Sequence, residues 1–296
     1  MLKKLMNWSE SITHKKVLEI CERNNAVAYP KVRLADIFSI EGSGISNELY
    51  SFALMAHFDV IVTDLQGYPL FAVEFDGPTH TDPKQIERDM KKDTLCKRFD
   101  LPILRITSEF LDGKHTNMNL LGWFIEYWFV YKDFEKGKQK GELAYDEPFM
   151  IESVISIPGT KQPFPLWLSG PIRNKINKLY KQNLIEDDAP SSLLWEDRGN
   201  SEYHCLAWIV IDDNRAVYTT GKMKVQNFIP YMEDALDEVT VVQLYLILTE
   251  VLNGGGSPVS VAEINKTISN MKAKYGNVIS GGGPGNSKID FWKSKA

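Results

Sequence analysis

The stretch AVEFDGPTH, residues 72–80, joins an apolar, strand-like run to a polar segment. Two carboxylates, Glu74 and Asp76, interrupt the apolar run, and a glycine and His80 follow them. A buried strand seldom carries unpaired carboxylates, because removing a charge from water is costly. The residues before and after this stretch indicate why it carries them here.

The preceding residues predict an antiparallel hairpin. Two apolar runs, residues 57–65 and 68–74, flank Gln66-Gly67, which we interpret as a two-residue turn. Counting outward from this turn places Asp59 opposite Glu74, and the two-residue period of a strand puts Asp76 on the same face. Facing carboxylates repel each other, so they need a cation, a shared proton or solvent.

The following residues predict a helix and a returning strand. Asp82 can cap the helix, Pro83 suits its first position, and the apolar residues 103–106 read as a buried strand. Strand, helix and strand form a crossover that is expected to be right-handed. It would bring three charged helix residues toward the carboxylates: Asp89, Lys92 and Asp93.

The carboxylate cluster suggests a metal site. Carboxylate oxygens are hard ligands that suit Mg²⁺ or Mn²⁺. Such an ion polarises a phosphoryl oxygen and lowers the pKa of a bound water, which makes hydrolysis of a phosphodiester feasible at neutral pH. A strand that ends in a metal site explains the two carboxylates.

Taken in order, these residues resemble the PD-(D/E)xK, or restriction-endonuclease-like, nuclease superfamily. The resemblance covers roughly residues 8–110. The chain looks like a branch formed by a domain of unknown function, whose members also carry a segment like residues 30–36, and is more distantly similar to very-short-patch repair endonucleases. The residues that carry the resemblance are Asp59, Glu74-x-Asp76-Gly77 with His80, Arg88-Asp89, Lys92-Asp93 and residues 101–106.

The resemblance implies an α/β fold with a restriction-endonuclease-like core, a mixed sheet flanked by helices. It also implies that Asp59 and Glu74 hold Mg²⁺ or Mn²⁺, with Asp76 completing the shell directly or through water. Asp76 stands where many superfamily members have a lysine. The missing positive charge is then expected from Lys92, or else from Lys91, to stabilise the developing phosphate charge.

Several further residues keep more than one interpretation. His80 is expected to supply a base or orient the attacking water, or else to be a loop histidine. On the first predicted helix, Glu10 and Glu19 compete for a supporting role that stays open. The candidate nucleic-acid contacts, which also suit a solvated helix face, are Arg88, Lys91 and Lys92. The candidate supporting acids, which also suit surface ion pairs, are Asp89 and Asp93.

A second domain is predicted beyond the nuclease-like region. Residues 1–131 form the first domain, ending in an aromatic-rich helix over 120–131, and the charged residues 132–145 form a connector. Residues 146–296 form an α+β domain for substrate or protein-partner recognition. We expect its glycine-rich end, which includes residues 281–285, to be a flexible tail.

Composition limits the possible functions. The 296 residues are 43% hydrophobic, enough to bury a sizeable core, and the net charge of −5 excludes a generally basic nucleic-acid coat protein. The three cysteines have no zinc-site spacing, and no apolar run is long enough to suggest a membrane segment. A cytoplasmic location is expected.

The sequence predicts a metal-dependent nuclease, an endonuclease in restriction, repair or defence, with DNA as the preferred substrate and RNA as the alternative. The alternative is an inactive module that keeps the fold and binds nucleic acid or protein, which the absent strand lysine favours. A third possibility is a structural interaction protein whose C-terminal half carries its purpose.

Overall fold

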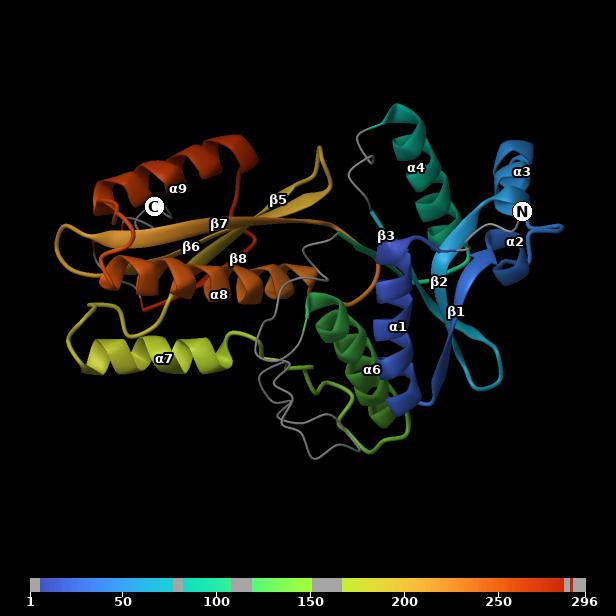
Figure 1. Cartoon of the computed structure of the whole chain (residues 1–296), viewed down its shortest axis with the longest axis horizontal. Coiled ribbons are helices and arrows are strands. Elements are labelled where there is room, and N and C mark those ends of the chain that lie inside the picture. The colour runs from blue at the N-terminus through green and yellow to red at the C-terminus, as the bar shows by residue number, and fades with distance from the viewer. Residues whose placement is uncertain (1–5, 77–81, 108–118, 151–166, 285–287, 290–296) are drawn as a thin grey trace. The chain divides into compact units, whose positions relative to one another are not determined.

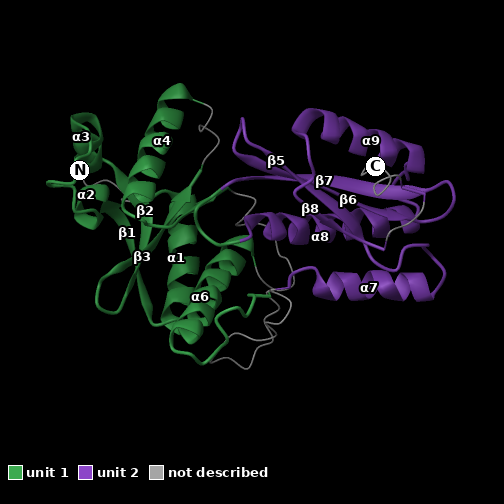
Figure 2. Cartoon of the chain, turned by 180° about the vertical axis from the view of Figure 1, so that it is seen from behind, with its two compact units in different colours: residues 1–150, 156–163, 226–230 green, residues 151–155, 164–225, 231–296 purple. Residues whose placement is uncertain are grey.

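The computed structural model describes residues 6–76, 82–107, 119–150, 167–284 and 288–289. The chain divides into two compact units (Figure 2). Unit 1 comprises residues 1–150, 156–163 and 226–230, and unit 2 comprises residues 151–155, 164–225 and 231–296. One short segment from late in the sequence, residues 226–230, is thus part of the first unit. Residues 77–81, which include His80, lie outside the described part of the chain.

Unit 1 contains a mixed sheet of four strands in the order β1-β2-β3-β4 (Figure 1). Strands β1, β2 and β3 pair antiparallel, whereas β3 and β4 pair parallel. The expected mixed α/β core is therefore present. The strands are β1 Ala26–Arg33, β2 His57–Asp64, β3 Pro69–Phe75 and β4 Ile103–Ile106.

Helices flank this sheet, and local signals define their starts. The Asn7 side chain and Glu10 form a capping box at the start of α1. Asp82 caps α4, and Pro83 is its first residue, as the sequence predicts. The helices of unit 1 are α1 Trp8–Arg23, α2 Leu34–Ile37, α3 Asn47–Met55, α4 Pro83–Arg98 and α6 Leu120–Gln139.

The β2–β3 hairpin reaches the expected register by a different route. The predicted two-residue turn is wrong: Asp64 N donates to Tyr68 O at 3.0 Å, leaving a three-residue loop that ends at Gly67, whose φ is +88°. This left-handed glycine suits such a loop. A register shift after Val62 then adds one residue to β3 and cancels the difference. Extending the pair Val60–Val73 by one residue places Asp59 opposite Glu74.

The charged segment after Tyr131 is helical rather than a connector. Helix α6 continues to Gln139, so the predicted helix end at Tyr131 is wrong. Lysine and glutamate are good helix formers, and the charges therefore do not end the helix. The helix ends just before Gly141, whose φ of +74° suits a residue that follows a helix.

The segment 226–230 completes unit 1 beside β4. Ile103 N donates to Asn227 O at 3.0 Å, and the Gln226 side chain bonds both N and O of Arg105 at 2.7 and 3.2 Å. Phe228 lies with its ring 5.2 Å from that of Phe71 in the core. The segment thus covers the outer edge of β4, which would otherwise expose backbone groups.

Unit 2 contains an antiparallel sheet in the order β7-β6-β5-β8. The predicted hairpin is confirmed, since Val210 pairs with Ala216 around residues 212–215. Its strands are β5 Ser191–Asp197, β6 Glu202–Val210, β7 Ala216–Lys224 and β8 Ser280–Gly282. Its helices are α7 Gly170–Lys181, α8 Met232–Leu252 and α9 Val261–Tyr275.

Alternate residues of β6 contact helices on the two faces of this sheet. Ala207 and Ile209 pack in a cluster with α7 and α8 residues. Leu206 and Trp208 pack in another with Ile264 of α9. The alternation follows from the two-residue period of a strand. No described helix of either unit is both long and apolar enough to cross a membrane.

The glycine-rich end of the chain is partly a strand. The expectation of a flexible tail is wrong for residues 280–282, which pair with β5 as β8. Glycine permits this close approach, because a Cβ at Gly281 would lie 2.8 Å from Ser192 O. Residues 285–287 and 290–296 lie outside the described part of the chain.

Gly281→Ala is expected to lower the free energy of unfolding of unit 2 by about 1–3 kcal/mol, because its methyl group would collide with β5. Gly282→Ala is the matched control, since a Cβ there meets nothing within 4 Å. Hydrogen exchange at the β5 amides Ser192–Leu194 measures the effect on strand pairing. Equal protection in the two variants would contradict the close packing of β8.

Candidate functional site

A buried ion pair joins strand β3 to helix α4. Lys92 Nζ donates to Glu74 Oε2 at 2.6 Å, and both side chains are less than one-tenth exposed. Lys92 points inward because it shares the buried face of α4 with Leu95 and Cys96. Burial raises the pKa of Glu74 to about 7; Lys92 opposes this shift, and the nearby charge of Asp59 adds to it.

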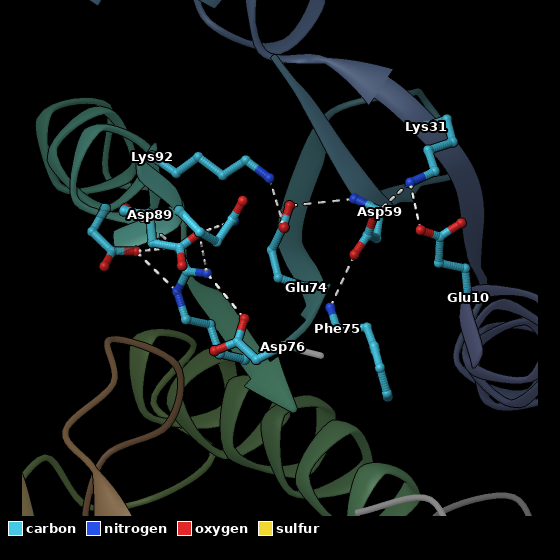
Figure 3. Close-up of polar contacts among 11 residues, drawn as sticks. Glu10, Lys31, Asp59, Glu74, Phe75, Asp76, Asp89 and Lys92 are labelled. Atoms are coloured by element: carbon cyan, nitrogen blue, oxygen red, sulfur yellow. Dashed lines mark hydrogen bonds and ion pairs between the residues drawn. The ribbon is translucent and has the colours of Figure 1, made fainter. Parts of the chain in front are cut away.

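Asp59 adjoins Glu74 on the neighbouring strand. Asp59 N lies 3.3 Å from Glu74 Oε1, and Phe75 N donates to Asp59 Oδ2 at 3.0 Å (Figure 3). The other oxygen, Oδ1, accepts from Lys31 Nζ at 2.7 Å. The hairpin register therefore brings the two predicted acids together, while a separate lysine binds each of them.

Lys31 links the first helix to this centre. Its Nζ also donates to Glu10 Oε1 at 2.9 Å, so it bridges α1 and β2. Burial opposes its charge, but hydrogen bonds to Asp59 and Glu10 outweigh this and raise the pKa of Lys31. Its backbone is left-handed, with φ of +56° inside strand β1. That conformation costs a non-glycine residue about 1–2 kcal/mol.

A second polar cluster surrounds Arg105 on β4. Its guanidinium lies 2.8 Å from Asp93 Oδ1, 3.3 Å from Asp76 Oδ1 and 3.4 Å from Asp89 Oδ1. Burial opposes the charge of Arg105, yet the charges of Asp93, Asp76 and Glu74 outweigh it and raise its pKa. Arg105 is the β4 partner of Glu74, so the two clusters adjoin across the sheet. Figure 3 shows Asp76 and Asp89 turned toward this second cluster.

The predicted site residues thus separate into groups. Asp59, Glu74 and Lys92 form one centre. Asp76, predicted as a third metal ligand, contacts Arg105, as do the two supporting acids Asp89 and Asp93. His80 lies outside the described residues.

The other two predicted nucleic-acid contacts, Arg88 and Lys91, contact residues of α3 and take no part in the ion pair of Lys92 with Glu74. The Arg88 guanidinium lies 5.9 Å from the centre of the Phe52 ring. Lys91 pairs with Glu48 at 2.7 Å and with Glu87 at 2.5 Å. Both face α3, whereas Lys92 is buried, so a surface for phosphate would use Arg88 and Lys91 without Lys92.

Sequence reasoning assigned no role to Lys31 or Arg105 in the two clusters. It named Glu10 only as one of two candidates for a supporting role. Glu10 carried a signal, since it stands on the first helix, but nothing separated it from Glu19. Arg105 follows two apolar residues in a predicted buried strand, and a charge at such a position indicates a buried ion pair. Lys31 lies in the segment 30–36 that the family resemblance includes, but nothing in the sequence indicated its left-handed backbone or its contact with Asp59.

The donor chemistry of the centre suits a hard divalent cation, but the lysines already occupy its oxygens. Asp59 and Glu74 offer carboxylate oxygens from adjacent strands. Among the residues that the structure describes, no group of three His, Cys, Asp or Glu side chains has the arrangement of a metal site. An ion held by Asp59 and Glu74 would take over contacts that Lys31 or Lys92 now make.

Comparison with known proteins gives one match. Residues 2–118 match a family described as Protein of unknown function (DUF2726). No curated protein and no solved structure matches the chain. The matched residues include every member of the two polar clusters, but neither α6 nor the segment 226–230. The residues that match the family therefore include the candidate site, and the family description assigns no activity to it.

Proposed function

We propose that this chain is a metal-dependent phosphodiester hydrolase, an endonuclease acting on DNA rather than RNA in restriction, repair or defence. One observation supports this proposal above the others. Lys92 lies 2.6 Å from Glu74, and Glu74 adjoins Asp59 across the hairpin. Two acids and a lysine thus lie together, the combination of side chains that the proposed chemistry needs, and the lysine comes from helix α4 instead of from β3.

Each residue of this centre has a role that its contacts support. Asp59 and Glu74 would hold Mg²⁺ or Mn²⁺, which when bound polarises a phosphoryl oxygen and activates a water. Lys92 orients Glu74 through Oε2 and keeps positive charge beside the reacting phosphate. Phe75 N orients Asp59 through Oδ2. Arg105 is a positioning residue that holds Asp76 next to this centre.

The surroundings of the centre complete the proposal. Arg88 and Lys91 would attract the phosphate backbone near the site, and the C-terminal unit would recognise substrate or a protein partner. His80 follows β3 closely in sequence, and we propose that it assists proton transfer.

A cleavage assay on duplex DNA, single-stranded DNA and RNA, with Mg²⁺, Mn²⁺ or EDTA, tests the function. Asp59→Asn and Glu74→Gln are each expected to reduce metal-dependent cleavage by at least about 100-fold, since both remove a charged metal donor. Asp133→Asn, at an exposed acid of α6, is the matched control and should cleave like the wild type. Absence of metal-dependent cleavage of every substrate would contradict the proposal.

The inactive binding module remains the second candidate, and the saturated carboxylates favour it. Every oxygen of Asp59 and Glu74 has a contact with a lysine amine or a backbone N–H. Such a centre could stabilise a fold that binds nucleic acid without cutting it. Fluorescence anisotropy with labelled DNA in EDTA, compared with the cleavage assay, separates the two: binding without cleavage under any metal condition favours the module.

A further inference from the structure

We propose that Lys31 competes with the divalent cation for Asp59, so that the ion binds this carboxylate only when the lysine amine leaves it. The inference rests on the proposed function, because it concerns the ion of that site. It makes the strand residue Lys31 a determinant of metal affinity, a role that neither the sequence pattern nor the family match assigns.

The first argument is the position of the amine. Pro30 pairs with Val60 and Val32 with Phe58, so the register of β1 and β2 puts Lys31 opposite Asp59. The Lys31 amine lies 2.7 Å from Asp59 Oδ1, while Oδ2 accepts from Phe75 N. Oδ1 is thus the oxygen that can turn to a cation without breaking the backbone contact, and Lys31 occupies it.

The second argument is the backbone of Lys31. A left-handed residue inside a strand persists only where the surrounding structure holds it there. Glycine would adopt φ of +56° without a steric penalty, yet a lysine stands at this position. The contacts that offset the penalty are those of its amine with Asp59 and Glu10.

The third argument is that the amine has another carboxylate to which it can move. Glu10 Oε1 lies 2.9 Å from Lys31 Nζ, so the lysine keeps an ionic partner after it leaves Asp59. The Lys31 side chain is also 31% exposed, against 9% for Lys92, so water can solvate it during the exchange. Of Lys31 and Lys92, Lys31 is therefore the one whose amine can leave its carboxylate for an ion with the smaller loss of free energy, because water can solvate it.

Calorimetric titration of the full chain with MnCl₂, without nucleic acid, tests this competition. Lys31→Met and Lys31→Gly are each expected to bind Mn²⁺ about tenfold more tightly than the wild type, because a competing and repelling charge is removed. Lys31→Gly suits the left-handed backbone and thus guards against misfolding in the methionine variant. Lys97→Met, at an exposed lysine in the last turn of α4, removes the same charge away from Asp59 and should leave the affinity unchanged.

The outcomes separate this inference from the proposed function. If the wild type and both Lys31 variants bind Mn²⁺ equally, or the variants bind more weakly, Lys31 is no competitor and the metal site itself still stands. If Lys97→Met tightens binding as much as the Lys31 variants, the effect is one of net charge and the competition is refuted. If no protein binds Mn²⁺, both the metal site and the competition fail. Binding by the Lys31 variants alone supports the competition in its strongest form.

Discussion

Lys92→Met is expected to lower the free energy of unfolding of unit 1 by about 3–5 kcal/mol, because it leaves the buried Glu74 carboxylate without its cation. The pair lies 2.6 Å apart and is almost fully removed from water. Chemical denaturation followed by fluorescence measures the loss. Lys91→Met is the matched control, since it removes the adjacent lysine, whose ion pairs with Glu48 and Glu87 lie at the surface, and should change stability little.

The loss should depend on pH through Glu74. In the folded protein the pKa of Glu74 is raised from 4.5 to about 7, so this group favours folding most below pH 4.5, and that contribution is lost as the pH rises through 7. Without Lys92 the folded pKa should rise further, since an attractive charge is gone. Lys92→Met should therefore be less destabilising at pH 5 than at pH 8. Equal losses at both pH values would show that Glu74 is not the group left unpaired.

Phe228→Ala is expected to destabilise unit 1 by about 3–5 kcal/mol, because it removes a buried ring from the core. Phe228 is 6% exposed and packs against Phe71 of β3, although it is distant in sequence from residues 2–118, which match the family. Hydrogen exchange should show lost protection at the amides of β3 and β4. The effect on unit 1 of a residue from late in the sequence would establish that segment 226–230 belongs to its core.

Asn227→Ala provides the control for this experiment. Asn227 is exposed, and its backbone oxygen, which the substitution keeps, accepts from Ile103 N. Protection in β3 and β4 should therefore match that of the wild type. If Phe228→Ala also leaves protection unchanged, the segment is an accessory to unit 1 and the first 150 residues carry its stability.

Local chemistry determined much of unit 1. The strand over residues 57–64, the capped helix beginning at Pro83 and the apolar strand over residues 103–106 could all be predicted, since each depends on periodicity or on capping side chains near in sequence. The β2–β3 turn could not, because the Asp64 side chain, which accepts from Gln66 N and Tyr68 N, and a bulge after Val62 set its form together. Their effects cancel, so the register prediction held while the turn prediction failed.

Contacts between residues that are distant in sequence could not be predicted from the sequence. No periodicity in segment 226–230 indicates that it lies beside β4. Its backbone hydrogen bond to Ile103 depends on the free edge of β4, which exists only in the folded unit. The end of α6 was also mispredicted. The charged residues of its last turns have the composition of a connector, but they continue the helix to Gln139. The pairing of β8 with β5 likewise depends on a close approach of the two backbones, at which a side chain on Gly281 would collide with β5.

For the candidate site, the sequence by itself determined the chemistry and the tertiary structure decided the partners. The expected hairpin and crossover predicted that Asp59 and Glu74 would lie near Lys92, Asp89 and Asp93, although the turn on which the hairpin count rested was wrong. The tertiary structure assigned Asp76 to Arg105 and placed Lys31 between Glu10 and Asp59. Such pairings depend on side-chain reach and burial across several elements, which spacing along the chain does not encode.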